Sequence, residues 1–548
     1  MKEFLKKHGG FILLMLIILG GGCLRFYGLD WGLPNRYHTD ENAFINAVNA
    51  MRKAPRLNYL NPKWFYHPSL GMYVLCVMAK ATSFFRELDL PTVHLLGRLY
   101  AAFCGTLSVW AVYLVGKKLY SGASGLLSAL FLACTVIHIQ NSHYFTPDVP
   151  LTLYLLLAMF FAADIYEGGR RRSYVLAGVF SGVAMATKYW APTMLMVVVA
   201  HLIRFFSQKE RGLSRLISVN LLCGILAAFI TFFLCSPYVI LDYREAFPRI
   251  IRWAAITAGR IPQVWALHCE KTTPYSFHLL KLFPWAMGLP LEVAGFLGLV
   301  WAFFRHRKAD LLVLSWIVVN FLLIGSWYIK FTRYILPLVP FLCITGARFL
   351  VELYKGRSTR RGRILAGGAT VAVALLSGVY ACMFTAVYAQ PHSRTAAAGW
   401  IRENLAPGSL VVVDGPSNVR IPVRKEDPAW SRFRFRYLDF IPLFIGNPPR
   451  EEKERYLKEI LSGADALVLN EAYRRYYEAA GDLYPVENRF WDDLFSGRLG
   501  FRLVETFKTY PKLGPFFIND DAAEMSFAFS DHPAVYVFIK TLSNGVME

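Results

Sequence analysis

Charged residues are scarce in this sequence. They make up 18% of its 548 residues, whereas 55% are hydrophobic. So low a charge content argues against a chain made only of soluble domains. Apolar runs of about twenty residues recur between Phe11 and Val387, and each can cross a hydrocarbon core of about 30 Å as a helix. Because a helix satisfies its own backbone hydrogen bonds, we expect residues 1–387 to form a polytopic α-helical membrane bundle.

Cysteine is missing from the last third of the chain. None of the nine cysteines follows Tyr388, so this tail has neither a disulfide framework nor a cysteine metal site. No further spanning run, internal repeat or low-complexity tract appears there. Residues 388–548 are therefore predicted to be a soluble mixed α/β domain. Its expected elements are helices at Thr395–Asn404 and Glu451–Ser462, and strands at Ser409–Val413, Ala466–Leu469 and Ala534–Lys540.

Acidic residues are the minority among the charged ones, 38 against 59 basic, which gives a net charge of +21. In a soluble protein this excess would suggest nucleic acid as a partner. Here the basic residues cluster in short loops between apolar runs, which is the orientation signal of a membrane protein, so nucleic acid is not expected. The clusters are Lys2–Lys7, Lys117–Lys118, Arg170–Arg172, Lys209–Arg215, Arg305–Lys308 and Lys355–Arg363.

Placing every basic cluster in the cytoplasm gives about eleven spans and a cytoplasmic N-terminus. The N-terminal apolar segment could be a signal peptide, but we interpret it as an uncleaved first helix. Pro68–Phe85 is interpreted as an interfacial or re-entrant helix inside a long external loop, residues 28–94, followed by a span over Leu95–Val115. A second external loop is expected at 236–287, and residues 388–548 would also be extracytoplasmic. The expected location is the plasma (inner) membrane.

This topology places several ionisable side chains on one face. The first group is acidic: Asp40 and Glu41 follow the first span, and Asp148 lies at the outer end of a later one. Each could instead be a helix cap, because acidic residues are favoured in a first helical turn. Two histidines accompany them: His67 precedes a proline at a helix start, and His143 precedes Asp148 in the same loop.

The second group is cationic and lies on the side where positive charge is unusual. It comprises Lys188, Lys330 and Arg333. Their long side chains could reach toward lipid headgroups. Alternatively they could hold an anionic group, for which the forked guanidinium of arginine matches phosphate. Carboxylates and cations gathered on one face suit sugar transfer from a lipid-linked phosphate, since one carboxylate can deprotonate an acceptor hydroxyl while cations stabilise the departing phosphate.

In the order of these features the chain resembles the GT-C glycosyltransferases of the dolichyl-phosphate-mannose protein mannosyltransferase type, which include bacterial aminoarabinose transferases. Two motifs depart from that pattern: Ser69 replaces a second proline, and Val149 separates an aspartate from its proline. The motifs that carry the resemblance are Asp40-Glu41, His67-Pro68-Ser69-Leu70, Arg98 within Gly97-Arg98-Leu99-Tyr100, Asp148-Val149-Pro150, Lys188, and Arg333-Tyr334-Ile335-Leu336-Pro337-Leu338-Val339-Pro340.

The resemblance implies a GT-C fold and an inverting transfer of a monosaccharide from a polyprenyl-phosphate donor to a glycan, lipid or protein acceptor at the outer face. Asp40 would be the general base, Glu41 would orient the acceptor or coordinate a cation, and Asp148 would position a hydroxyl. No cofactor is assigned, and a divalent metal held in part by Glu41 stays open. The residues expected to bind the donor phosphate are Arg333, Lys330, Lys188, His67, His143 and Arg98.

Two other classes of protein fit part of the pattern. A transporter or lipid flippase would also place charges at membrane depth. Against it, the spans show no Gly/Pro-broken helices in matching halves and no inverted repeat. A structural subunit that only presents its tail outside would leave the clustered carboxylates unexplained.

Overall fold

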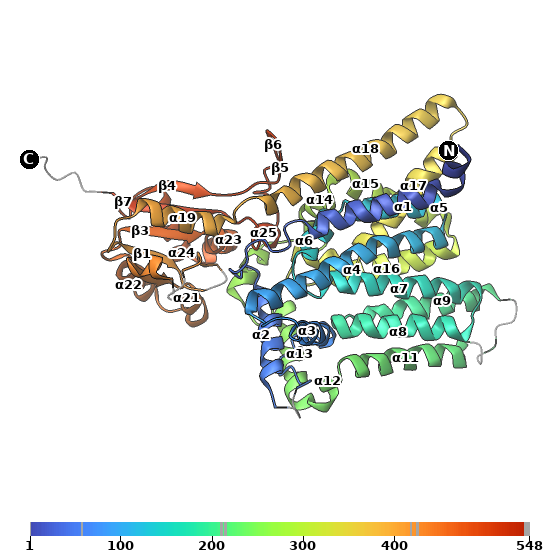
Figure 1. The fold of residues 1–548 in the computed structure, drawn as a ribbon, viewed down its shortest axis with the longest axis horizontal. Coiled ribbons are helices and arrows are strands. Elements are labelled where there is room, and N and C mark those ends of the chain that lie inside the picture. Colours follow the sequence, from blue (N-terminus) through green and yellow to red (C-terminus); the bar gives the residue numbers. More distant parts are fainter. Residues whose placement is uncertain are drawn as a thin grey trace, which may run out of the picture. The chain divides into compact units, whose positions relative to one another are not determined.

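The computed structural model describes residues 2–55, 59–208, 212, 216–416, 419–423 and 427–541, and the side chains from residue 8 onward. The predicted basic cluster Lys209–Arg215 lies almost wholly outside these residues, as do the side chains of Lys2–Lys7. The chain divides into two compact units (Figure 1). Unit 1 comprises Met1–Leu29, Asp40–Thr257 and Pro274–Thr385, and unit 2 comprises Asp30–Thr39, Ala258–Thr273 and Ala386–Glu548.

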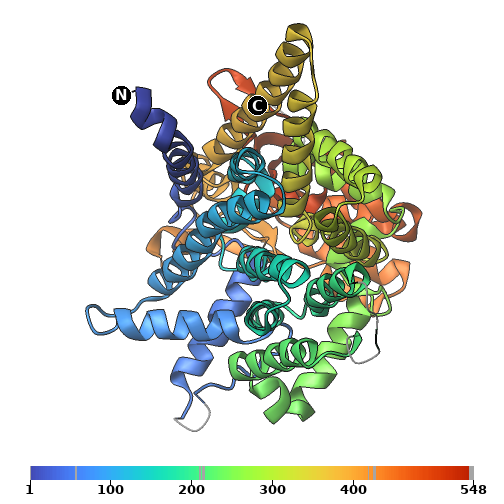
Figure 2. The ribbon, with the colours of Figure 1, turned by 90° about the vertical axis from the view of Figure 1, so that its right-hand side faces the viewer.

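Unit 1 is helical, and Figure 2 views many of its helices close to end-on. The chain is a multi-pass membrane protein, as predicted. Its helices are α1 (Lys2–Phe26), α2 (Thr39–Lys53), α3 (Leu70–Thr82), α4 (Leu90–Leu119), α5 (Gly122–Ala133), α6 (Val136–Ser142), α7 (Asp148–Glu167), α8 (Arg171–Thr187), α9 (Met194–Ser207), α11 (Val219–Cys235), α12 (Tyr238–Leu241), α13 (Tyr243–Thr257), α14 (Phe283–Met287), α15 (Leu289–Arg305), α16 (Lys308–Gly325), α17 (Val339–Lys355) and α18 (Arg360–Thr385).

Among the described residues, five helices are long and apolar enough to span a membrane, or seven if two bent pairs each count as one span. The bends are 60° between α5 and α6 and 118° between His278–Met287, which ends with α14, and α15. The predicted number of about eleven spans is larger. Part of the difference lies in α9 with its preceding turn and in α11, which are apolar helices of 10–17 residues, shorter than the length that defines a span. Helix α3 is also of this length, but it was not predicted to span the membrane.

Small residues let neighbouring helices of the bundle approach closely. A Cβ atom at Gly178 of α8 would collide with the backbone carbonyl of Gly224 on α11, and one at Gly298 of α15 would collide with that of Thr345 on α17. In a bilayer, where lipid is as apolar as leucine, such close backbone contact favours helix association. The sequence at these positions therefore determines which helices pair.

The predicted external segments of unit 1 contain short helices. The helix expected at Pro68–Phe85 is observed as α3 and has 13 residues, and the span expected at Leu95–Val115 is the longer α4. Hydrogen bonds join the two predicted external loops, 28–94 and 236–287. Asp242 of the second accepts from Asn61 at 2.8 Å and from Lys63 at 2.7 Å, both in the first. These donors lower the pKa of Asp242, so its carboxylate is charged at neutral pH.

Unit 2 is a three-layer α/β domain. Its five-stranded sheet has the order β2-β1-β3-β7-β4. Strands β2, β1 and β3 run parallel to one another, β7 runs antiparallel to β3, and β4 runs antiparallel to β7. Side chains alternate between the two faces: Val411 and Val413 pack under one helical layer, and Val412 packs under the other. The strands are β1 (Leu410–Asp414), β2 (Arg434–Leu438), β3 (Ala466–Asn470), β4 (Phe501–Phe507), β5 (Lys512–Leu513), β6 (Phe516–Phe517) and β7 (Val535–Lys540).

The helices of unit 2 include α19 (Ser393–Asn404), α20 (Pro428–Ser431), α21 (Ile441–Gly446), α22 (Arg450–Leu461), α23 (Glu471–Ala480), α24 (Pro485–Phe495) and α25 (Met525–Ala528). The mixed α/β character predicted for the tail is confirmed, and β1, β3, β7, α19 and α22 begin and end within two residues of the predicted bounds. The unit also takes in two segments from the preceding part of the chain. Trp31 donates to the carbonyl of Gln390 at 2.6 Å, and His268 lies 3.0 Å from Glu524.

Candidate functional site

The acidic pair predicted to lie in the first external loop opens helix α2, whose first turn contains Asp40 and Glu41. Negative charge is favoured there because the first backbone N–H groups of a helix lack partners. The Asp40 side chain is 37% exposed, and its Oδ2 lies 2.9 Å from Nη2 of Arg333. Arg333 belongs to the short helix η5 (Thr332–Ile335), between α16 and α17. The fold thereby joins the first external loop to a connection late in the bundle.

A second ion pair is formed at the ends of two other helices. Asp148 is the first residue of α7, and Lys188 directly follows the last residue of α8. Each charge has the sign that its helix end favours. Nζ of Lys188 donates to Oδ1 of Asp148 at 2.7 Å, and both side chains are largely buried. This pair keeps two opposite charges together at the same end of adjacent helices.

His67 connects the two ion pairs electrostatically. It lies in the loop before α3, and the pKa of its imidazole is lowered to about 4, chiefly by burial. The charges of Lys188 and Arg333 contribute to this lowering, whereas those of Asp40 and Asp148 oppose it. The ring is therefore neutral at neutral pH. The cations of the two ion pairs also face one ring, that of Tyr334, so the pairs belong to a single site.

Glu41 and Arg98 occupy the interior next to this site. Both carboxylate oxygens of Glu41 accept from Arg98, at 2.8 and 2.9 Å, and the two side chains are 0% and 3% exposed. Arg98 also donates to the carbonyl of Leu29, and the backbone N–H of Phe145 donates to Glu41. The sequence suggested an acceptor or cation contact for Glu41 and a phosphate contact for Arg98. In the structure they bind one another and hold α2 against α4.

His143 and Lys330 are also buried. The two ring nitrogens of His143 lie 2.9 and 3.0 Å from the carbonyl oxygens of Ile139 and Tyr27, which fixes the end of α6 against the chain after α1. Lys330 is 3% exposed, and its ammonium donates to the carbonyl of Tyr328. The structure thus brings Asp40, Arg333, Asp148, Lys188 and His67 together, and places the other four predicted residues around them.

Aromatic residues that the sequence did not single out line the site. The ring of Tyr334 lies 4.9 Å from the ammonium of Lys188 and 5.6 Å from the guanidinium of Arg333, a cation–π arrangement with both cations. Its position beside Arg333 in the sequence was the available signal. The imidazole of His67 lies 5.2 Å from the ring of Phe44 and 6.4 Å from that of Trp253 on α13. Nothing in the sequence marked these two contacts.

A small cavity borders the second ion pair. Its lining includes Pro147 and Thr187, the chain neighbours of Asp148 and Lys188. The remaining lining is mostly apolar and comes from α2, α3, α4, α7 and the loop between α6 and α7: Phe44, Gly71, Tyr100, Phe145, Thr146 and Pro150. Charge and apolar surface therefore meet at one place.

The possibility of a divalent metal was tested against the side chains. Within the part of the chain that the structure describes, no group of three or more His, Cys, Asp or Glu residues is arranged to hold a metal ion. Glu41, the one residue suggested as a ligand, is bonded to Arg98.

Comparison with known proteins gives the fold a family context. Residues 92–240 match the family described as dolichyl-phosphate-mannose-protein mannosyltransferase, a segment that includes Arg98, His143, Asp148 and Lys188. An uncharacterized protein of Aquifex aeolicus is 26% identical over 355 residues. That match spans 62% of this chain and 64% of the relative, which is less than two thirds of the relative's length.

Two solved structures share the fold at low sequence identity. ArnT from Cupriavidus metallidurans, bound to undecaprenyl phosphate, superposes with a TM-score of 0.50 at 15% identity, covering 97% of this chain and 98% of that one. The archaeal oligosaccharyltransferase AglB from Archaeoglobus fulgidus, in complex with an inhibitory peptide and a dolichol-phosphate, gives 0.50 at 13% identity, covering 88% and 72%. The comparisons confirm that this chain has the GT-C fold and resembles the glycosyltransferases of the dolichyl-phosphate-mannose protein mannosyltransferase type.

Proposed function

We propose that this protein is an inverting glycosyltransferase that moves a monosaccharide from a polyprenyl-phosphate donor to an acceptor hydroxyl at the outer face of the plasma (inner) membrane. The observation that carries the proposal is the convergence of Asp40–Arg333 and Asp148–Lys188 around the neutral ring of His67. Two carboxylates and two cations meet the needs of a reaction that removes one proton and releases one phosphate anion.

Asp40 is the proposed general base. Its carboxylate is the more exposed of the two in the site, and it pairs with the Arg333 guanidinium at 2.9 Å. It accepts the proton of the acceptor hydroxyl while the hydroxyl oxygen forms a bond to C1 of the sugar. The bond from C1 to the phosphate oxygen breaks, and its electron pair leaves with the polyprenyl phosphate. Attack opposite the leaving group inverts the configuration at C1.

Arg333 and Lys188 are the proposed contacts of the donor phosphate. A guanidinium has five N–H donors in a fixed plane, so Arg333 can contact Asp40 and a phosphate oxygen together. Lys188 adds a second positive charge, which faces the same Tyr334 ring as Arg333, and Lys330 adds a third close by in the chain. Preorganised cations stabilise the negative charge that grows on the leaving phosphate. Because that phosphate is already a stable anion, no strong general acid is required.

Asp148 is the proposed positioning group for Lys188 or a sugar hydroxyl, since its carboxylate holds the ammonium at 2.7 Å. Three buried residues would support the site without touching the substrate: Glu41, Arg98 and His143. They fix α2, α4 and α6, so that Asp40 is presented to the site by the residue directly after it. The neutral His67 offers a hydrogen bond to phosphate or sugar without adding charge.

The topology belongs to the same proposal. The N-terminus would lie in the cytoplasm, and the site and the C-terminal α/β unit would lie outside, with that unit contributing to acceptor binding. Basic loops support this orientation: Lys117, Lys118 and Arg170–Arg172 lie at the ends of α4, α7 and α8 opposite those that carry Arg98, Asp148 and Lys188.

The test is sugar transfer in proteoliposomes. Purified protein receives a panel of radiolabelled polyprenyl-phosphate sugars with membrane extract as the acceptor source. We expect wild type to consume one donor and Asp40→Asn to lose about 10²- to 10⁴-fold of the rate, the usual contribution of a general base. Glu87→Gln, which alters an exposed carboxylate of the same external loop, is the matched control and should retain full activity.

Two outcomes would contradict the proposal. Full activity of a normally folded Asp40→Asn variant would remove Asp40 as the base. If no donor were consumed across the panel while labelled lipid changed leaflet, the protein would instead be a flippase.

A further inference from the structure

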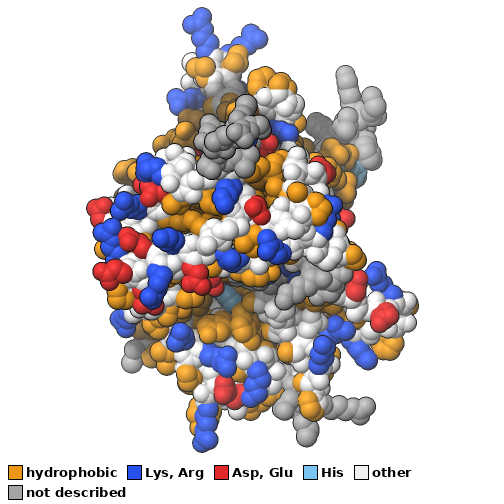
Figure 3. Space-filling model, turned by 90° about the vertical axis from the view of Figure 1, so that its left-hand side faces the viewer, with side chains coloured by type: hydrophobic (Ala, Val, Ile, Leu, Met, Phe, Trp, Pro, Cys, Tyr) orange, Lys and Arg blue, Asp and Glu red, His pale blue; other side chains and the backbone are white. Residues whose placement is uncertain are grey.

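The β5–β6 hairpin of unit 2 exposes an apolar tip. Leu513 is 50% exposed, Phe516 74% and Phe517 62%. Leu513 pairs with Phe516 and Lys512 with Phe517 across a two-residue turn, in which Gly514 has a φ of +58° that glycine adopts without strain. Large side chains this exposed usually mark a contact surface when they are adjacent. By contrast, positive and negative side chains are interspersed over the face drawn in Figure 3.

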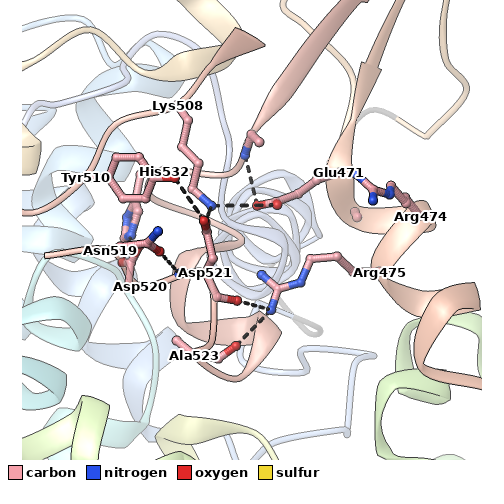
Figure 4. Close-up of polar contacts among 12 residues, drawn as sticks. Glu471, Arg474, Arg475, Lys508, Tyr510, Asn519, Asp520, Asp521, Ala523 and His532 are labelled. Carbon is pink, nitrogen blue, oxygen red and sulfur yellow. Dashed lines mark hydrogen bonds and ion pairs between the residues drawn. The ribbon is translucent and has the colours of Figure 1, made fainter. Parts of the chain in front are cut away.

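The base of the hairpin is held rigidly by polar contacts (Figure 4). Lys508 forms an ion pair with Asp521 and lies 3.9 Å from Glu471, and Tyr510 donates to Asp521 at 3.1 Å. Arg475 of α23 donates to the carbonyl of Asp521, so the segment that follows the hairpin is tied to the same helix as Glu471. The network fixes both strands at their base and leaves the tip to project from it.

The position of the hairpin along the fold indicates what covers the tip. Strand β5 packs against η6 (Ala386–Ala389), which begins at the residue after α18 ends. Helix α18 is a candidate membrane span, and its 26 residues are about enough to cross the hydrocarbon core. Within unit 2 the hairpin thus contacts the residues that directly follow α18 in the chain.

We propose that the tip of this hairpin inserts into the headgroup–acyl boundary of the lipid leaflet from which α18 emerges. Phenylalanine and leucine side chains bury in that layer, and the exposed Lys512 beside them can meet anionic headgroups. Tyr510, whose ring lies 5.7 Å from that of Phe517, has the amphipathic character typical of the interface. The hairpin would thus attach unit 2 to the membrane in addition to the covalent links at the ends of its three segments. This inference is independent of the transfer reaction.

The experiment is site-specific photo-crosslinking of the full-length protein in nanodiscs of phosphatidylcholine and phosphatidylglycerol. Phe516→p-benzoyl-phenylalanine places the photoreactive ring at the tip. Ile445→p-benzoyl-phenylalanine, at a 76% exposed position on α21 of the same unit, is the matched control. We expect about tenfold more lipid adduct from position 516 than from 445, measured by mass spectrometry of the digested protein.

The contribution of the neighbouring charge is tested in the same assay. Adding Lys512→Gln should reduce the adduct at 516 by about fivefold in the anionic nanodiscs and leave it unchanged in phosphatidylcholine alone. Both labelled positions are exposed, so gel filtration should give the wild-type profile. Equal lipid adducts at 516 and 445 would overturn the proposal. Crosslinks from 516 mainly to a second copy of the chain, or to an added acceptor fraction, would assign the tip to that partner instead.

Discussion

Asp40 and Glu41 are adjacent on one helix turn but have opposite environments. The carboxylate of Asp40 is 37% exposed and meets Arg333 through one contact, whereas that of Glu41 is fully buried and meets Arg98 through two. A helix turns by about 100° per residue, so neighbouring side chains necessarily point to different faces. One face of α2 therefore belongs to the site and the other to the packing that supports it.

An ion pair can therefore serve chemistry or architecture, and at the start of α2 the proposed chemical role goes with the more exposed carboxylate. A buried pair is costly to break, because removing one partner leaves the other charge in a low-dielectric interior. A partly exposed pair can exchange partners with a substrate at little cost. Substitutions in buried and exposed ionisable groups should therefore differ in what they damage and by how much.

Breaking the buried pair should unfold much of the structure. Glu41→Ala leaves the Arg98 guanidinium without its carboxylate, and we expect the free energy of unfolding to fall by about 3–5 kcal/mol, measured by titration with SDS. The double variant Glu41→Leu/Arg98→Met is the control and should recover part of this loss. If Glu41→Ala had the same free energy of unfolding as wild type, the Glu41–Arg98 pair would not stabilise the fold.

A buried carboxylate without an ion-pair partner sharpens the comparison. Asp414 ends β1 and is 1% exposed; it accepts the N–H of Asn470, and its other oxygen has no hydrogen-bond partner among the described residues. Burial raises the pKa of Asp414 from 3.8 to about 7. The folded state binds this proton more tightly than the unfolded state. The protonated Asp414 therefore makes its whole contribution to the free energy of unfolding below pH 3.8, and this contribution is lost as the pH rises toward 7.

The loss from this one group is up to about 4 kcal/mol. Asp414→Asn cannot ionise, so we expect it to abolish this slope and to be more stable than wild type at neutral pH. Hydrogen exchange of the β1 amides across this pH range measures both effects. A variant whose β1 amides keep the wild-type pH dependence would mean that another group causes it.

Weakening the second site pair should affect transfer more than folding. Asp148→Asn keeps the shape of the side chain but removes the charge that holds Lys188, and we expect transfer in proteoliposomes to fall by about 10- to 100-fold. Asp164→Asn is the matched control, because Asp164 lies near the other end of α7, where it pairs with Lys118. Equal losses in the two variants would contradict a specific role for Asp148.

The smallest effect is expected from a pair at the surface. Lys63 is 60% exposed where it meets Asp242, so Lys63→Gln should lower the free energy of unfolding by less than about 1 kcal/mol. The same SDS titration, repeated at high salt, should show the remaining difference disappear. A loss comparable with that of Glu41→Ala would mean that the two external segments depend on this contact.

Several features could be predicted because they depend on local sequence. The apolar runs predicted the bundle, and the alternation at Ala534–Lys540 predicted a strand that is observed as β7. Spans were counted less well, since a run of apolar residues does not reveal where Gly288 or the bend after α5 divides it. The short segments Asp30–Thr39 and Ala258–Thr273 joined unit 2 through contacts such as His268–Glu524, which no local pattern signals.

Hydrophobicity and helix-end charge are local properties of the chain. The amino-acid sequence alone therefore predicts a membrane-embedded helical part and a mixed α/β part, and it marks ionisable residues at helix ends. The pairing of Asp40 with Arg333 and of Asp148 with Lys188, and the joint burial of Glu41 and Arg98, are visible only in the folded chain. A charge finds its partner through helix packing, and packing depends on side chains far apart in the sequence.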